Sequence, residues 1–173
     1  MNSNELLALL PKSESEAFLG PQGIKLFTDE KIFNQAQVGY SIDKNGANIA
    51  ANSEGTWQST WLVIAKDTEL ADPYYVDLND KQLAVYTAIF CQDTNQWQST
   101  LVASTLSGFL ECISLLYQFT EQTEPQFIPN SNSIFDLEKL EACGIQLATI
   151  SEHTDFWKSF FISYVEWLQD EHV

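Results

Sequence analysis

The 173-residue chain contains no arginine: its eight basic residues are all lysine, set against 24 aspartates and glutamates, for a formal net charge of −16. Without a guanidinium the chain has no planar fork for phosphates or guanine edges, and its electrostatic field repels polyanions. We therefore expect no direct binding of nucleic acid. The same charge would attract a basic partner and speed its capture, with simple solubility as the alternative explanation.

Residues that form catalytic and metal sites are also scarce. Histidine occurs twice, glycine seven times, and the chain has no G-x-S-x-G, no G-x-G-x-x-G and no phosphate-binding glycine loop. The sequence E-H-T-D around His153 supplies too few ligands for a metal site, which needs three or four. We expect no catalytic residue, no metal and no cofactor, hence a protein that is not an enzyme. A small hydrolase that pairs carboxylates across the fold is the alternative.

Cys91, Cys112 and Cys143 are widely separated, form no C-x-x-C and lie beside apolar residues. This pattern predicts reduced, partly buried thiols in a reducing compartment. No stretch approaches 18 consecutive apolar residues, and the first residues lack the basic region of a signal sequence. The sequence thus predicts a cytoplasmic protein without a membrane partner.

A length of 173 residues with 45% hydrophobic residues suits one domain that buries about 70% of its unfolded surface. The segment from 120 to 133 carries two prolines and little periodicity, which is typical of a connector. We predict a sheet-and-helix body over residues 1–120. Residues 121–173 are predicted to form the connector and a C-terminal helical pair, packed on the same single domain.

The apolar run Trp61–Ala65, bounded by Lys66-Asp67, predicts a strand buried on both faces. A second strand is predicted to begin after Pro73, because the first residue of a strand need not donate to the ladder. The strands expected in addition are 24–27, 83–91, 97–102 and a weak one after Gly39. The predicted fold class is α+β: a single central, mostly antiparallel sheet of five or six strands, flanked by N-terminal short helices and C-terminal helices.

Capping signals and periodicity place the helices. A helix is predicted to end before Pro11, and a short one after Ser13 would bury Phe18 and Leu19 and end at Gly20-Pro21. The other predicted helices are one from Thr28, one from Ser104 to Tyr117, and the C-terminal pair, 133–143 with Gly144 as its stop and 151–170. The last helix has an aromatic stripe of Trp157, Phe161, Tyr164 and Leu168, which we expect to pack on the chain's own sheet; an oligomer or partner surface is the alternative.

Several of these features occur in one order: a Trp-headed apolar strand, an acidic turn, and then D-P-Y-Y-V-D-L-N-D. A further strand (84–92) and a Trp-bearing segment follow, leading into a helix with T-L-S-G-F-L-E-C-I. Over roughly Leu9 to Leu116 the chain resembles the SUKH superfamily, which includes bacterial immunity proteins that neutralise toxins and fungal cell-wall regulators. The resemblance implies a small α+β fold and a protein that works by binding another protein.

Toxin neutralisation is the leading hypothesis: the chain blocks a cognate toxin by protein–protein contact, and its charge favours a basic target such as a nuclease. The alternative is a regulatory scaffold that binds cell-wall or signalling proteins. Exposed acids and large aromatics near the predicted hairpin are the candidate partner-binding residues, although the acids also fit a merely solubilising role and the aromatics a place in the core. The candidates are Asp67, Glu69, Asp72, Tyr74, Asp77, Asp80 and Trp97.

Overall fold

The computed structural model describes residues 1–13 and 15–170, and within them the chain forms six strands and five helices. The strands build one antiparallel sheet in which spatial order follows chain order, from β1 at one edge to β6 at the other. The strands are β1 (Glu16–Leu19), β2 (Gln22–Leu26), β3 (Trp61–Asp67), β4 (Pro73–Asp77), β5 (Val85–Cys91) and β6 (Gln96–Ala103). The predicted central antiparallel sheet is confirmed.

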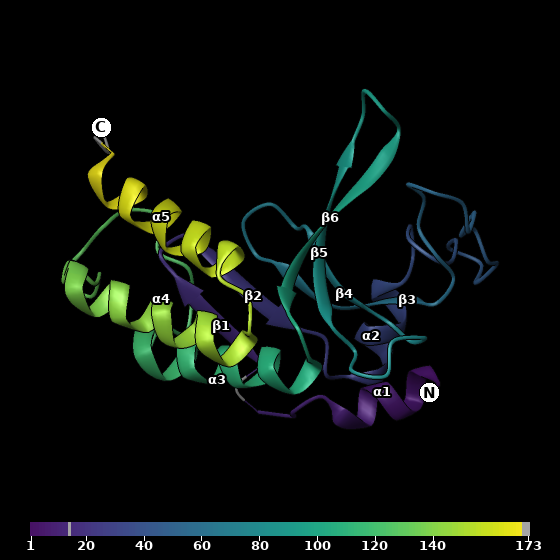
Figure 1. The fold of residues 1–173 in the computed structure, drawn as a ribbon, viewed down its shortest axis with the longest axis horizontal. Helices are drawn as coiled ribbons and strands as arrows, with labels where there is room; N and C mark the ends of the chain where they lie inside the picture. The colour runs from purple at the N-terminus through teal and green to yellow at the C-terminus, as the bar shows by residue number, and fades with distance from the viewer. Residues whose placement is uncertain (14, 171–173) are drawn as a thin grey trace.

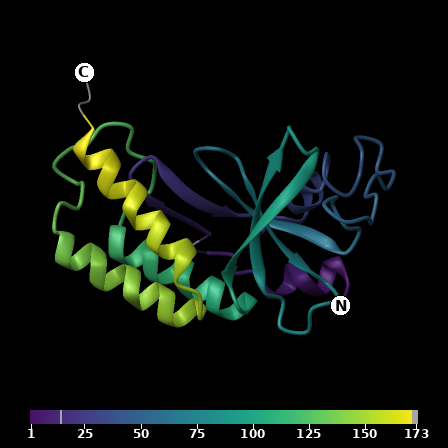
Figure 2. The same cartoon turned by 45° about the horizontal axis from the view of Figure 1, so that its top comes forward.

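The helices are α1 (Ser3–Leu9), α2 (Glu30–Ala36), α3 (Leu106–Thr120), α4 (Leu137–Ser151) and α5 (Asp155–Gln169). Helices α3, α4 and α5 gather on one side of the molecule, with α1 toward its opposite end (Figures 1 and 2). The side chain of Tyr74 marks the sheet face that α3 and α5 cover, because its ring lies 5.7 Å from that of Phe109 on α3 and 6.0 Å from that of Phe156 on α5. The short N-terminal helices and the C-terminal helices make the fold α+β, as predicted.

A single buried cluster joins the sheet to the helices of both chain ends, from Leu6 on α1 to Tyr164 on α5. Hydrogen bonds fasten the last helix to the rest of the chain. The Gln22 side chain donates to the Phe160 carbonyl at 2.6 Å, and the Tyr164 hydroxyl accepts from the Ile134 amide at 2.8 Å. Trp157, Phe161 and Tyr164 are buried, so the aromatic stripe of α5 belongs to the chain's own core.

The helix predicted around Phe18 and Leu19 is wrong, because Glu16–Leu19 is strand β1. Gly20-Pro21 is the two-residue turn of a hairpin in which Leu19 pairs with Gln22. Gly20 has a φ of 67°, and such tight turns favour glycine because it takes positive φ without strain. The signal interpreted as the end of a helix is therefore the corner between two strands.

Residues 37–60 form a long crossing between α2 and β3, seen in blue at the right of Figures 1 and 2. The weak strand predicted after Gly39 is reduced to isolated bridges of Ile42 with Val38 and Asn48. The crossing nonetheless contributes buried Trp57 and half-buried Tyr40. The crossing therefore adds two aromatic side chains that the strands of the sheet do not provide.

The side chain of Gln37, at the start of this crossing, makes hydrogen bonds to β3 where that strand has no neighbouring strand on one side. Strand β2 pairs with β3 at residues 65–67, and the register of β3 with β4 shifts between Val63 and Ala65. The buried Gln37 side chain accepts from the Val63 amide at 3.0 Å and donates to the carbonyls of Val63 and Phe33, both at 2.9 Å. These bonds satisfy backbone groups that the core hides from water.

Replacing Gln37 by alanine is expected to lower the free energy of unfolding by about 3 kcal/mol, because it leaves buried backbone donors and acceptors without partners. Urea denaturation followed by far-UV circular dichroism measures the change. Gln35→Ala is the matched control, since Gln35 is exposed in the last turn of α2, two residues before Gln37, and surface changes of this kind shift stability by only about 0.5 kcal/mol. Equal midpoints for the two variants would contradict the role assigned to Gln37.

Candidate functional site

Opposite the face that Tyr74 presents to the helices, the sheet carries a contiguous cluster of aromatic rings. Tyr75 follows Tyr74 and so points to the other face. Its ring stacks on Trp61 of β3, at 4.6 Å and 26°, and on Tyr86 of β5, at 5.6 Å and 24°. Trp57 contacts both Trp61 and Tyr75. We call this cluster the aromatic surface: Tyr40, Trp57, Trp61, Tyr75, Tyr86, Phe90 and Trp97.

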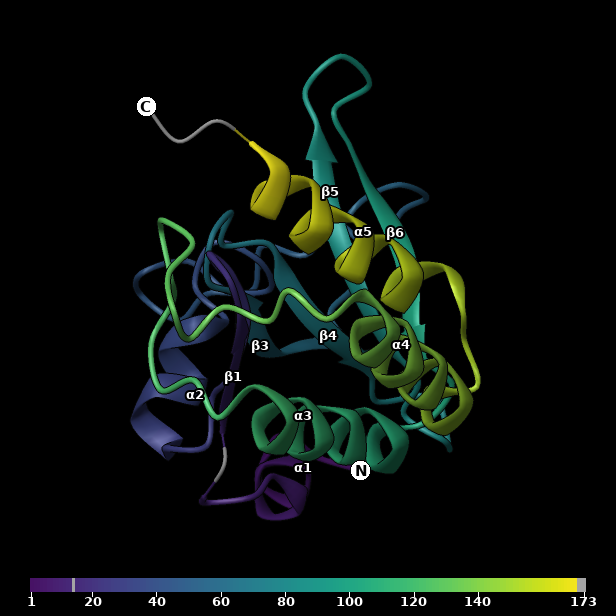
Figure 3. The same cartoon turned by 90° about the vertical axis from the view of Figure 1, so that its left-hand side faces the viewer.

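The aromatic surface has a buried base and an accessible outer part. Trp57 and Tyr75 are buried, Tyr86 and Trp97 are half-buried, and Phe90 is 42% exposed. Phe90 and Trp97 are paired directly across β5 and β6 with their rings 5.3 Å apart, on the hairpin that extends beyond the rest of the sheet (Figures 1 and 3). The accessible rings therefore rest on a fixed aromatic base.

Hydrogen bonds fix the base of this surface. The Trp57 indole N–H donates to the Trp61 carbonyl at 3.2 Å, and the hydroxyls of Tyr75 and Ser99 lie 2.7 Å apart. Buried Trp and Tyr side chains need such partners for their polar atoms. Because the rings are held by strands and by each other, little side-chain entropy is left to lose when a partner covers them.

Acidic residues stand at both ends of β4, the strand that carries Tyr75. Asp72 precedes the strand. Burial, and to a smaller extent the charge of Asp72, raise the pKa of Tyr40. Asp77 ends the strand, is paired with Trp61 in the register, and adds to the factors that raise the pKa of Tyr75, of which burial is the largest. Five residue steps separate the two carboxylates in sequence, about 17 Å along a strand. The charge of each of these two carboxylates therefore acts on one tyrosine of the aromatic surface.

The candidate acids of the β3–β4 turn form one local group. The Asp67 carboxylate accepts from the amides of Glu69 and Leu70 at 2.9 and 2.6 Å, which shapes the turn. Burial and the neighbouring Asp67 charge both raise the pKa of Asp72, and Glu69 is exposed. The turn therefore offers a concentrated negative charge, of which Asp67 is also a structural part.

The remaining candidate acids, at the other end of β4, shape the following loop. Asp77 accepts from the Asn79 amide at 2.9 Å, and Asp80 accepts from the amides of Gln82 and Ala84 at 3.0 and 2.8 Å. Both are half-buried. The structure does not bring them together with the Asp67–Asp72 turn, because the length of β4 separates the two groups.

Tyr74 was a predicted contact residue, and the structure places it in the core instead. Its side chain is only 3% exposed between α3 and α5, and burial, with the charges of Asp67 and Asp72, raises its pKa well above the usual value. No partner can reach it without opening the helical layer. Trp97, in contrast, lies on the aromatic surface beside Phe90, Trp57 and Tyr40.

The three thiols are free, with Cys112 and Cys143 buried and Cys91 half-buried, as the sequence predicted. Burial raises the pKa of Cys112 to about 12 and that of Cys143 to about 11, so both remain protonated near neutral pH and are poor nucleophiles. Among residues 1–13 and 15–170, no three His, Cys, Asp or Glu side chains come together in a way that could hold a metal ion.

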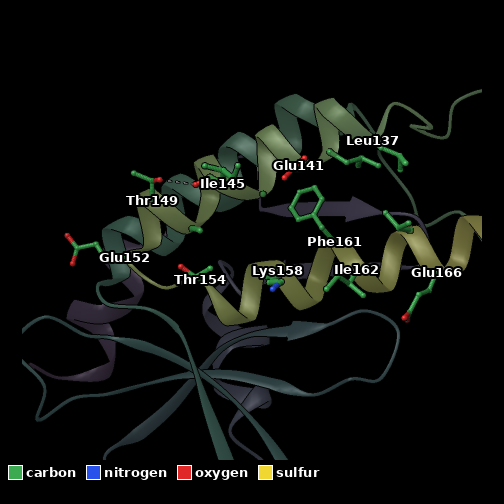
Figure 4. A pocket seen from close by; sticks show the side chains of 14 residues that line it. Leu137, Glu141, Ile145, Thr149, Glu152, Thr154, Lys158, Phe161, Ile162 and Glu166 are labelled. Carbon is green, nitrogen blue, oxygen red and sulfur yellow. Dashed lines mark hydrogen bonds between the residues drawn. The ribbon is translucent and has the colours of Figure 1, made fainter.

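A second surface feature is an open groove of about 850 Å³ between α4 and α5, which we call the helical groove (Figure 4). The prediction that α4 stops at Gly144 is wrong, because the helix continues to Ser151. A Cβ at Gly144 would lie 3.3 Å from Cδ2 of Phe161. The glycine therefore permits α5 to approach α4 closely and does not end the helix.

The helical groove is lined by apolar and charged side chains of both helices. Phe161 points from α5 toward α4 in Figure 4, and Thr149 donates to the Ile145 carbonyl at 2.9 Å. Leu137, Ile145 and Ile162 line the groove with 56%, 62% and 46% of their surfaces exposed. Charged side chains also line it: Glu141, Glu152, Lys158 and Glu166.

Within the described part of the chain, no helix is both long enough and apolar enough to cross a membrane. Comparisons of the chain with protein-family models, with curated proteins and with solved structures gave no match. The chemistry of the two surfaces is therefore the ground on which function is inferred.

Proposed function

We propose that this chain is an immunity-type binding protein of the SUKH superfamily that neutralises a cognate, basic protein toxin by direct contact and without catalysis. The observation that carries the proposal is the aromatic surface, with accessible Phe90 and Trp97 on a fixed base and with Asp72 and Asp77 at the two ends of the strand that carries Tyr75. The resemblance of the sequence from roughly Leu9 to Leu116 to that superfamily supports the same function.

Aromatic anchors surrounded by polar groups are what tight protein interfaces need. Tryptophan and tyrosine dominate interface hot spots because they bury a large apolar area at little entropic cost, and surrounding groups exclude water from them. Here two strands and a pair of facing rings hold Trp97 and Phe90 before any partner arrives. Such a preformed contact avoids much of the ordering cost of binding.

The charge of the chain favours a basic target. The chain has eight lysines for 24 carboxylates. Since the carboxylates outnumber the lysines threefold, the electrostatic field at the surface is negative. A nuclease binds its substrate through a basic groove that neutralises phosphates. A protein of net charge −16 complements such a groove and excludes the nucleic acid from it. We therefore propose occlusion of a substrate groove as the means of neutralisation.

Co-expression with the product of a neighbouring toxin-like gene tests the proposal. Cells that make this chain are expected to survive induction of the toxin, and cells that make an unrelated acidic protein of equal charge are expected to die. The second strain separates specific neutralisation from a general effect of acidity. Death of both strains, with this chain present in excess, would refute the proposal.

A further inference from the structure

The helical groove between α4 and α5 has the dimensions of a docking site for a helix. Each of its two helices has 15 residues, which gives walls of about 22 Å at 1.5 Å per residue. Leu137, Ile145 and Ile162 expose about half of their surfaces or more along it. Exposed apolar side chains that gather in one groove beside polar groups are typical of interaction surfaces.

The walls determine which kind of backbone fits. A partner in strand conformation needs free amides and carbonyls to pair with, but the backbone groups inside α4 and α5 are used within each helix. An amphipathic helix needs none, because its own backbone is satisfied and it contributes a stripe of apolar side chains at i, i+3, i+4 and i+7. The groove therefore suits a helix rather than a strand.

The charged side chains of the groove determine which charge its partner should carry. Glu141, Glu152 and Glu166 line the groove against the single cation Lys158, within a chain of net charge −16. A fatty acid would bring a carboxylate close to these acidic side chains, and a second copy of the chain would bring another large negative charge. Both meet like charge, whereas lysines and arginines flanking an apolar stripe meet opposite charge.

We propose that the helical groove binds a basic amphipathic helix of a partner protein, with the apolar stripe of that helix against Leu137, Ile145 and Ile162. The groove belongs to the helical layer and the aromatic surface to the other face of the sheet, so a partner in the groove leaves the aromatic surface free. The groove site rests only on the surface chemistry of α4 and α5 and is independent of toxin neutralisation.

Synthetic peptides test the site on the intact chain. The probe is an amphipathic peptide of about 15 residues, long enough to form helix on a surface, with leucines on one stripe and lysines elsewhere. One control peptide has glutamates in place of the lysines, and another has the composition of the probe in scrambled order. Fluorescence anisotropy at about 0.15 M salt, where distant surface charges are screened, gives the affinities, and NMR shifts locate the contact.

Only the lysine probe is expected to bind saturably, with shifts confined to α4 and α5. The double variant Ile145→Ser/Ile162→Ser is expected to weaken its binding by about tenfold or more, as for the loss of buried interface anchors. Both residues are exposed, so the fold should persist. Leu70→Ser is the matched control, because Leu70 is 73% exposed in the β3–β4 turn, and it is expected to leave the affinity unchanged.

A triple variant with Glu141→Gln, Glu152→Gln and Glu166→Gln tests the acidic side chains of the groove. It removes three charges but no apolar contact, and it is expected to lower the affinity for the lysine probe. The site is overturned if the lysine probe does not bind saturably or if either control peptide binds equally well. It is also overturned if the isoleucine variant binds the probe like the wild type. Sedimentation that shows a dimer of the wild-type chain, lost in the isoleucine variant, would assign the groove to self-association and overturn it as well.

Discussion

A chain carrying Phe90→Ala and Trp97→Ala is expected to bind its cognate toxin about a hundredfold more weakly than the wild-type chain, or weaker still. The loss corresponds to about 3 kcal/mol, in the range observed when two central aromatic anchors are truncated. Both rings are accessible at the outer part of the aromatic surface, so the fold loses only the part of their contacts that faces inward. Isothermal titration calorimetry with the purified toxin measures the change.

Two controls separate binding from folding. Ile128→Ala removes a large exposed apolar side chain from the connector between α3 and α4 and is expected to leave the affinity within about twofold, as for most surface residues outside an interface. Near-UV circular dichroism of the double variant should keep the signal of the remaining tryptophans. If the double variant folds and binds with wild-type affinity, the aromatic surface is not the contact.

The association rate with the toxin is expected to fall by about ten- to a hundredfold as salt rises from about 0.01 M to about 1 M. Over that range the Debye length shrinks from about 30 Å to about 3 Å, and long-range attraction between the net charge of −16 and a basic toxin is screened. Dissociation is expected to change little, because aromatic contacts at close range hold the complex. Stopped-flow fluorescence of the tryptophans follows the reaction.

Amide variants locate the steering charge. Asp67→Asn, Glu69→Gln and Asp72→Asn together remove three charges from the β3–β4 turn beside the aromatic surface, while an asparagine side-chain oxygen at 67 still accepts from the turn amides. The association rate should fall at low salt and approach that of the wild type at high salt. The matched control is Glu5→Gln, Glu30→Gln and Glu124→Gln, exposed positions away from the turn. An equal effect of both triple variants would show that the turn has no special role.

Much of the sheet could be predicted because its strands are encoded locally. The run Trp61–Ala65 is apolar without interruption, and its last four residues are the buried part of β3. Gly20 and Gly144 were misinterpreted because a glycine signals only that the backbone or a neighbour needs room. Whether the cause is a hairpin turn, as at Gly20, or a ring from another helix, as at Gly144, depends on residues far away in the sequence.

The candidate site was predicted only in part. Trp97 and the acids at the ends of β4 were among the candidates, but Tyr74 lies in the core. Its neighbour Tyr75 lies on the opposite face of the sheet, and one residue of register decides which of the two tyrosines faces the helices. The pairing of Phe90 with Trp97 follows from the β5–β6 hairpin, so it could have been predicted from the sequence. The contribution of Tyr40 and Trp57 could not have been predicted, because both residues belong to the irregular crossing 37–60. The helical groove depends on which side of α4 remains uncovered, which only tertiary packing decides.

The most direct test of the central claim, neutralisation by stoichiometric contact, is a titration of purified toxin activity with this chain at toxin concentrations well above the dissociation constant. Toxin activity is predicted to fall linearly and to reach zero at one fixed molar ratio, with both proteins recovered chemically unchanged from the complex. Complete loss of toxin activity at a small fraction of that ratio would mean turnover and an enzyme. Full activity in the presence of excess chain would mean that the toxin is not its partner.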